Sequence, residues 1–197
     1  MKYPDACIAL FARVPVPGRV KTRLIPALGP DGACALHERL LARILGELEQ
    51  QELCAAGLWL DAAGQHPLIA ACRLPVHLQQ GEDLGARMAH ALGTMLQRKR
   101  FALVIGTDAP QLDAQCLELA LQALADGCDI VLGPAFDGGY VLIGMRERCA
   151  PVFEGVAWGS SRVLQQTLDL ITTAGLRCCL LAPQPDVDEP DDLRHVT

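Results

Sequence analysis

The chain has 197 residues, 51% of them hydrophobic and 20% charged, with a formal net charge of −6 at pH 7. This length suits one domain, residues 1–197, and this apolar content supplies a substantial core, so extensive disorder is excluded. The negative charge argues against a nucleic-acid partner, and the lack of an apolar run near the roughly 18 residues that cross a bilayer argues against a membrane partner.

The N-terminal residues MKYPDACIALFARV contain an apolar stretch that is too short for a secretory signal and ends at Arg13. The stretch lacks the small-residue cleavage site of a signal peptide. We therefore interpret it as a first strand and expect a cytoplasmic protein.

Short apolar runs and longer periodic segments then alternate along the chain. The short runs predict strands at residues 6–12, 57–60, 76–79, 101–105, 129–133, 140–145 and 176–181. Apolar spacings of three and four predict helices at residues 30–53, 67–72, 83–98, 112–125 and 161–174. This alternation predicts a three-layer α/β/α domain with a mostly parallel sheet, in which ligands bind at the carboxyl ends of the strands.

Cysteine and histidine usage points to neither a disulfide framework nor a zinc site. The nine cysteines are odd in number and form no C-x-x-C pair, which predicts reduced thiols that behave as small buried apolar groups. The five histidines lack the spacing of metal ligands.

The loop after the first predicted strand, RVPVPGRVKTRL, is the most unusual segment. Its proline-stiffened backbone contains Gly18 and carries four cations: Arg13, Arg19, Lys21 and Arg23. Arginine forks, a lysine point charge and a closely approaching glycine N–H are groups that bind phosphate oxygens. The alternative is an ordinary basic surface loop. A Walker motif is excluded, because no G-x-x-x-x-G-K is present.

A second candidate is VIGTDAPQL, in which Asp108 follows a buried strand and precedes Pro110. A carboxylate held at the sheet edge in this way can bind Mg²⁺, which usually takes one or two carboxylates together with substrate phosphates. The alternative is that Asp108 caps the next helix or forms a turn.

A third candidate is PAFDGGYVLIG, where Gly138 and Gly139 follow Asp137. The two glycines leave room for a ligand beside the backbone, and the Asp137 carboxylate can accept hydrogen bonds from sugar hydroxyls. The same letters are also a strong hairpin-turn signal, and both interpretations can hold together.

The last acidic segment, DVDEPDDL, has five acids within seven residues. Asp191 and Asp192 suit the first turn of a helix that starts at Pro190. Helix-start chemistry does not explain Asp186 and Asp188, which precede it.

Two weaker motifs complete the set. QQGEDLGARM predicts a base or ribose pocket through Gly81, Gly85 and Arg87, or a helix cap formed by Asp83. WGSS reads most simply as a helix N-cap, with Trp158 as a group that stacks on an acceptor.

In chain order, six stretches resemble the family called rSAM/selenodomain-associated transferase 1, also described as arsenosugar-biosynthesis-type glycosyltransferases. They are FARVPVPGRVKTRL, QGEDLGARM, VIGTDAPQL, GPAFDGGYVLIG, VAWGSSRVL and DVDEPDDL. They span Phe11 to Leu193, so the resemblance is global, and it implies a GT-A, or nucleotide-diphosphosugar transferase, fold. More distantly, the chain is similar to the molybdenum-cofactor guanylyltransferase, the phospholactate guanylyltransferase and the CMP-sugar synthetases.

In those distant relatives, an Asp after the central strand and an Asp before T-P-E-D-L hold the catalytic metal, and these positions match Asp108 and Asp188. The resemblance therefore implies a Mg²⁺ or Mn²⁺ cofactor, with Asp108 and Lys21 as catalytic groups. It also implies phosphate contacts for Arg13, Lys21 and Arg23 and substrate contacts for Asp137 to Gly139. Because loops after parallel strands share one edge, we expect the two metal-binding carboxylates to lie close together.

Three departures leave the reaction type open. The nucleotidyltransferases begin with L-A-A-G-x-G-x-R-M where this chain has FARVPVPGRVKTR, the glycosyltransferase D-x-D is reduced to Asp108, and Glu189 replaces a Thr before Pro190. We expect sugar transfer from a nucleotide sugar to a small-molecule acceptor. The alternatives are a nucleotidyltransferase that joins an NTP to a phosphorylated small molecule with release of pyrophosphate, and a non-catalytic nucleotide-binding module.

Overall fold

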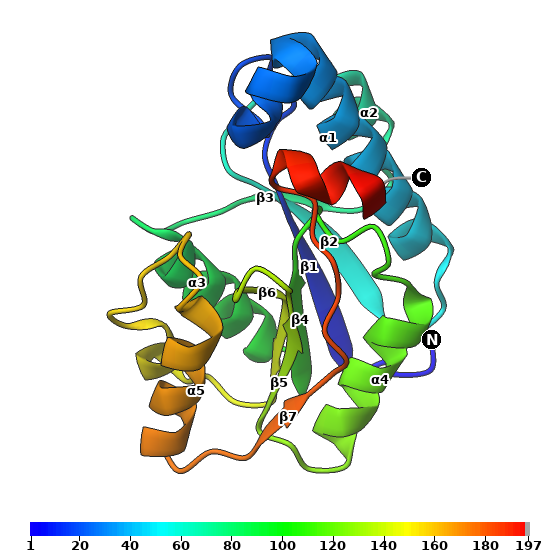
Figure 1. The fold of residues 1–197 in the computed structure, drawn as a ribbon. Helices are drawn as coiled ribbons and strands as arrows, with labels where there is room; N and C mark the ends of the chain where they lie inside the picture. The colour runs from blue at the N-terminus through cyan, green and yellow to red at the C-terminus, as the bar shows by residue number, and fades with distance from the viewer. Residues whose placement is uncertain (196–197) are drawn as a thin grey trace.

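The seven predicted strands form one sheet in the order β3-β2-β1-β4-β6-β5-β7 (Figure 1). The computed structural model describes residues 1–195, apart from the side chain of Ala150. The strands are β1 Ala6–Ala12, β2 Ala55–Leu60, β3 Val76–Leu78, β4 Phe101–Ile105, β5 Ile130–Pro134, β6 Tyr140–Met145 and β7 Cys178–Leu180. β6 runs antiparallel to β4 and β5, and the other neighbours are parallel, which confirms the mostly parallel sheet.

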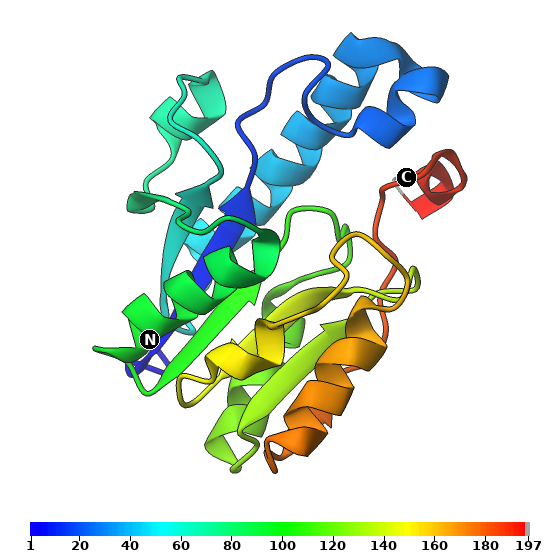
Figure 2. The same ribbon diagram turned by 90° about the vertical axis from the view of Figure 1, so that its left-hand side faces the viewer.

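Helices cover both faces of this sheet (Figures 1 and 2). α3 and α5 pack on one face, while α1 and α4 pack on the other. The helices are α1 Ile25–Gln50, α2 Pro67–Ala71, α3 Leu84–Leu96, α4 Ala114–Ala125 and α5 Val163–Thr173, with 3-10 turns η1 Thr22–Leu24, η2 Ala150–Phe153 and η3 Pro190–His195. The predicted α/β/α layering is therefore confirmed.

The central strands are apolar throughout because both of their faces are buried. In β1, Ile8 and Leu10 face the core under α1 and α4, whereas Ala9 and Phe11 face the core under α3. Successive side chains of a strand point to opposite faces, so a continuous apolar run supplies two cores at once. This arrangement holds the ends of β1 and β4 rigid at the edge where the loops gather.

The first long helix begins near the predicted residue but ends earlier than predicted. α1 starts with a short turn at Ile25, and a kink at Gly29, whose φ of 69° is outside the helical range, separates that turn from the helix that continues from Pro30. It ends at Gln50, because the Gln51 side chain accepts hydrogen bonds from the N–H groups of Leu53 and Cys54 and turns the chain towards β2. Although α1 has 26 residues, no helix among residues 1–195 is long and apolar enough to cross a membrane.

After β7 the chain returns to the other end of the molecule and packs on the beginning of α1 (Figure 2). Val187 is fully buried against Leu24, Leu36 and Leu40, and Leu193 packs beside them. The N–H of Val187 also donates to the carbonyl of Asp108 at 2.9 Å. This small core therefore fixes the acidic C-terminal segment over the loop that follows β4.

The cysteines correct one expectation. Cys128 and Cys179 form a disulfide, with 6.0 Å between their Cα atoms, so the prediction of nine reduced thiols is wrong for this pair. Cys128 precedes β5 and Cys179 lies on the neighbouring β7, and parallel pairing brings these distant positions into bonding range. The other seven cysteines are free.

Candidate functional site

A cavity of about 740 Å³ opens at the carboxyl edge of the sheet, among the loops that follow β1, β2, β3 and β4 and the start of β6. Its volume is within the range of sites for small molecules. Ten of the residues singled out from the sequence line it: Arg13, Lys21, Arg23, Asp83, Arg87, Asp108, Asp137, Gly139, Asp186 and Asp188. The structure therefore gathers residues of the basic loop, of QQGEDLGARM, VIGTDAPQL and PAFDGGYVLIG, and of the acidic C-terminal segment around one space.

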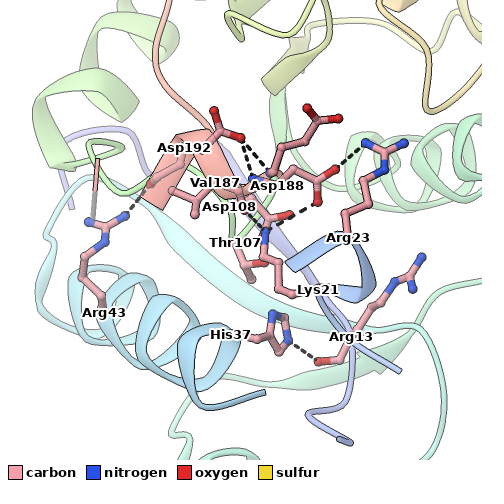
Figure 3. A network of polar contacts seen from close by, with 12 residues as sticks. Arg13, Lys21, Arg23, His37, Arg43, Thr107, Asp108, Val187, Asp188 and Asp192 are labelled. Carbon is pink, nitrogen blue, oxygen red and sulfur yellow. Dashed lines mark hydrogen bonds and ion pairs between the residues drawn. The ribbon is translucent and has the colours of Figure 1, made fainter. Parts of the chain in front are cut away.

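Lys21 lies at the centre of the polar network in this cavity (Figure 3). Its side chain is only 3% exposed, and its Nζ is 2.8 Å from Asp108 Oδ1 and 4.0 Å from Asp188 Oδ1. The same Nζ donates a hydrogen bond to the carbonyl of Val187. Three oxygens, two of them from carboxylates, thus surround one buried ammonium group.

The backbone at Lys21 is also unusual. Its φ of 48° and ψ of 43° are left-handed, and no other non-glycine residue among residues 1–195 has a positive φ. Such a conformation costs about 1 kcal/mol or more and persists only where the surroundings determine it. Here the loop turns sharply into η1, and the turn directs the lysine side chain inward.

The two candidate metal acids come together although they are far apart in the sequence. Asp108 is the third residue after β4, and the buried Thr107 donates from its Oγ1 to Asp108 Oδ1 at 2.8 Å. The cap of the following helix is Asp113, which accepts from the N–H of Cys116, so the capping alternative for Asp108 is wrong. The side chains of Asp108 and Asp188 are 42% and 35% exposed, so both remain open to the cavity.

Asp188 is held by a cation and by the start of η3. Arg23 Nη1 lies 2.6 Å from Asp188 Oδ2. The Asp192 carboxylate accepts from the N–H groups of Asp188 and Glu189, which is the helix-start chemistry expected for that acid. The position of Asp188 is therefore fixed from both sides.

Asp186 is a further acid at this site. Burial, together with the nearby carboxylates of Asp137, Asp192 and Asp188, raises the pKa of Asp186 to about 6. Asp186 and Asp188 line the same cavity, whereas the side chain of Val187, which lies between them in the sequence, is buried. This corner of the cavity is thus rich in negative charge.

A residue of α1 supports the basic loop. His37 Nε2 lies 3.0 Å from the carbonyl oxygen of Arg13, and this buried ring also lines the cavity. Arg13 is exposed and donates from its guanidinium to the carbonyl of Arg19. Gly18 does not line the cavity, but its φ of 79° supports the turn of the loop.

We expect His37 to make stability depend on pH. Burial lowers its pKa below the ordinary 6.5, and the charges of Lys21 and Arg13 act in the same direction. The hydrogen bond to the Arg13 carbonyl and the charge of Asp108 oppose this shift without cancelling it. The unfolded chain then binds a proton at higher pH than the folded chain, so stability falls as the pH drops below 6.5. In urea unfolding at about pH 7.5 and about pH 5.5, His37→Gln should lose less stability than wild type. Equal losses in the two proteins would contradict this.

Arg43 supports the segment that follows Asp108, a role that was not predicted from the sequence. From α1 it donates to the carbonyls of Ala109 and Leu112, at 2.8 and 2.9 Å. These two bonds hold the segment that follows Asp108. A single arginine in an amphipathic helix gives no sequence signal for such a role.

The predicted base or ribose pocket is only partly in the cavity. Arg87 lines it and donates to the carbonyl of Gly81, whereas Gly81 and Gly85 do not line it. A Cβ at Gly81 would lie 2.6 Å from the Arg87 nitrogen, and one at Gly85 would lie 2.6 Å from the Trp158 ring. These two glycines therefore allow close packing of the neighbouring segments of the chain. Asp83 caps α3, which is the alternative interpretation of this motif.

Trp158 likewise lies behind the cavity rather than in its lining. It packs near Phe153 and Tyr140, with ring centroids 6.5 and 6.3 Å away. The WGSS cap is not formed as predicted, because α5 begins at Val163 and no side chain caps it. The Trp158 ring therefore packs closely against Gly85 and does not line the cavity.

The D-G-G segment forms the turn between β5 and β6, and it also borders the cavity. Asp137 Oδ1 accepts from the N–H of Gly139 at 2.7 Å. Gly138 has a φ of 91°, and a Cβ there would lie 2.2 Å from the Ser161 carbonyl oxygen. Gly138 is thus required by the backbone, whereas Asp137 and Gly139 line the cavity.

This difference gives a matched pair of variants. Gly139→Val should abolish turnover and leave nucleotide affinity and melting temperature largely unchanged, because the added branches occupy cavity space. Gly138→Ala should instead lower the melting temperature, because the new methyl group collides with the backbone. Activity assays, nucleotide titrations and thermal melts check both. If Gly139→Val unfolds, or retains turnover, the substrate role of this turn is wrong.

Several lining residues escaped the sequence analysis. Asp61 and Gln79 directly follow β2 and β3, and Thr107, Glu82 and Tyr140 also line the cavity. Asp61 accepts from the N–H of Val14 at 3.0 Å and so ties the basic loop to the end of β2. The rule that ligands bind at strand ends could have found Asp61 and Gln79.

The acid pair fits the divalent ion that the sequence resemblance implies. Among residues 1–195, no three acidic, histidine or cysteine side chains are grouped to hold a metal. However, the Lys21 ammonium between Asp108 and Asp188 shows that this position accommodates a positive charge. Two carboxylates, with further oxygens from substrate phosphates, form a usual ligand set for Mg²⁺.

Solved structures with this fold include close and distant examples. A Desulfovibrio desulfuricans protein assigned to the nucleotide-diphospho-sugar transferases is similar with 33% identity and a TM-score of 0.89, over 98% of this chain and 86% of that chain. CMP:2-keto-3-deoxy-manno-octonic acid synthetase with CTP is similar with 12% identity and a TM-score of 0.62, over 98% and 96%. Mycobacterium tuberculosis Rv0371c with manganese is similar with 19% identity and a TM-score of 0.52, over 97% and 96%.

At such low identities, the last two likenesses concern the fold alone. No curated protein matches the chain in sequence. The profile of the DUF2064 family, described as "Uncharacterized protein conserved in bacteria", matches residues 40–160. This match and the 33% identity to the Desulfovibrio protein place the chain: it belongs to the DUF2064 family and has the nucleotide-diphospho-sugar transferase fold.

Proposed function

We propose that this protein is a metal-dependent transferase that moves a sugar from a nucleotide sugar to a small-molecule acceptor. One observation carries the proposal: Lys21 and Arg23 of the basic loop face Asp108 and Asp188 inside a single cavity. Cations for a diphosphate and carboxylates for a divalent ion are therefore adjacent. The transferase class is supported by the Desulfovibrio protein, with which the chain shares a third of its sequence. We also propose that the chain belongs to the rSAM/selenodomain-associated transferase 1 group, on the basis of the six stretches that resemble it.

Each side chain has a role in this proposal. Arg13, Lys21 and Arg23 bind the phosphates, and Asp108 and Asp188 hold a Mg²⁺ or Mn²⁺ ion. When bound, such an ion neutralises charge that develops on the leaving diphosphate. Thr107, Arg43 and the backbone N–H of Val187 keep the Asp108 segment in place, so the carboxylates need little rearrangement.

The acceptor is proposed to bind next to this cavity. A second hollow of about 390 Å³ shares Arg23, Asp137, Asp186 and Asp188 with the first. Phe136 lies at this hollow with 68% of its surface exposed. An exposed aromatic ring beside carboxylates suits a polyhydroxylated molecule, whose apolar ring face packs on the phenyl group while its hydroxyls donate to the acids.

A nucleotidyltransferase is the second candidate. Four cations near one cavity suit a triphosphate at least as well as a diphosphate, and three of them line it. In that reaction an acceptor phosphate attacks the α-phosphate of an NTP, and pyrophosphate leaves. The same acids and the same loop serve both reactions. The two candidates are therefore distinguished by which nucleotide the protein binds.

Calorimetric titration of NTPs and nucleotide sugars, each with and without Mg²⁺, tests the proposal. Sugar transfer predicts that a nucleotide sugar binds more tightly than the matching NTP and that slow hydrolysis releases a nucleoside diphosphate. Tighter NTP binding, with pyrophosphate released on addition of sugar phosphates, would favour the second candidate. If no nucleotide binds under either condition, both proposals are wrong.

A further inference from the structure

The buried ammonium of Lys21 has three oxygen partners that are also suited to a metal ion. They are Asp108 Oδ1 at 2.8 Å, Asp188 Oδ1 at 4.0 Å and the carbonyl oxygen of Val187. Hard divalent cations take carboxylate and backbone carbonyl oxygens as ligands. Lys21 therefore occupies the position at which these three oxygens converge (Figure 3).

A divalent ion cannot share this position with the ammonium group. Two cations within contact distance repel each other, and a 3% exposed side chain has little water around it to screen that repulsion. Lys21 also sits on a left-handed backbone, a conformation that non-glycine residues avoid. The ammonium group is therefore held in place by its contacts with Asp108 and the Val187 carbonyl and by the charge of Asp188, and it loses this support when another cation binds to these oxygens.

Resting on the proposed function, we propose that Lys21 and the divalent ion compete for one position, with Asp108, Asp188 and the Val187 carbonyl as their common ligands. When the ion is bound, the flexible lysine stem turns towards the open cavity, where the nucleotide phosphates lie. Lys21 is then both the counter-ion of the acids in the empty protein and a phosphate ligand in the loaded one.

This competition couples metal binding to nucleotide binding. The ion has to displace a paired lysine when it binds alone, so its affinity is low. With nucleotide present, the displaced ammonium gains new partners in the phosphates, so affinity for the ion rises. Linkage requires the converse: the ion raises affinity for the nucleotide by the same factor.

The experiment measures Mn²⁺ affinity calorimetrically on the intact protein without nucleotide. Lys21→Met keeps the length of the side chain and removes the competing charge, so it should bind Mn²⁺ at least about tenfold more tightly than wild type. Arg23→Met is the matched control. It also removes a cation beside Asp188, but one whose side chain is 52% exposed and which does not bridge the two acids. Its effect should be much smaller.

A second measurement separates competition from general charge effects. Adding the nucleotide that binds best should raise Mn²⁺ affinity strongly in wild type and much less in Lys21→Met. Mn²⁺ affinity in Lys21→Met equal to or below that of wild type overturns the proposal, as do equal gains in Lys21→Met and Arg23→Met. If no protein binds Mn²⁺ with or without nucleotide, the proposed function fails together with it. If all bind Mn²⁺ equally, only the competition fails. Should Lys21→Met not fold, Lys21→Gln provides the same comparison.

Discussion

Asp108→Asn should lower metal-dependent turnover by about 100-fold or more while the protein stays folded. The amide keeps the size of the side chain and can still accept from Thr107, but it supplies no charge to a divalent ion. Turnover is measured with saturating Mg²⁺, and the folded fraction is measured by circular dichroism. The alternative, in which Asp108 serves the fold alone, predicts lost stability with unchanged turnover per folded molecule.

Lys21 complicates this test, and a second variant resolves it. With Asp108 neutralised, the buried ammonium loses the negative charge of its nearer carboxylate and keeps only that of the more distant Asp188. A buried charge with fewer partners should lower the free energy of unfolding by about 1–3 kcal/mol. Adding Lys21→Met to Asp108→Asn should restore stability, because it removes the buried charge that lost its partner. Unchanged instability in the double variant would show that Asp108 supports the fold in another way, while turnover per folded molecule is compared between wild type and Asp108→Asn alone.

Arg23→Ala should weaken nucleotide binding by roughly 1–3 kcal/mol, the scale of a charge-assisted hydrogen bond to a phosphate. Stability should change little, because exposed ion pairs contribute about 1 kcal/mol or less. Isothermal titration with the preferred nucleotide and urea unfolding measure the two effects.

Arg19→Ala is the control for this loop. Arg19 belongs to the same cluster of four cations but does not line the cavity. It should change nucleotide affinity much less than Arg23→Ala does. Equal losses in the two variants would mean that the loop acts only through its overall charge, and unchanged affinity in both would remove its proposed role.

The strands and helices could be predicted because their signals are local. In β1 and β4 an unbroken apolar run satisfies both buried faces, and in α3 the apolar spacing of three to four marks one buried face. The boundaries were less accurate where a single side chain ended an element, as Gln51 does after α1. The disulfide was missed because it depends on the pairing of β5 with β7, which neither cysteine reveals in the sequence.

The sequence by itself determined the α/β/α layering and the edge of the sheet where a site forms, since residue periodicity and strand-end position fix both. It also identified the basic loop, Asp108 and Asp188 as chemically unusual. Only the tertiary structure decided how they meet. Val187 packs against α1 and thereby positions Asp188 near Asp108. The left-handed turn at Lys21 directs its ammonium group between the two carboxylates. His37 and Arg43 support this arrangement from α1 through bonds to distant carbonyls. Such contacts join residues that are far apart in the chain, so they arise from packing and leave no local pattern to read.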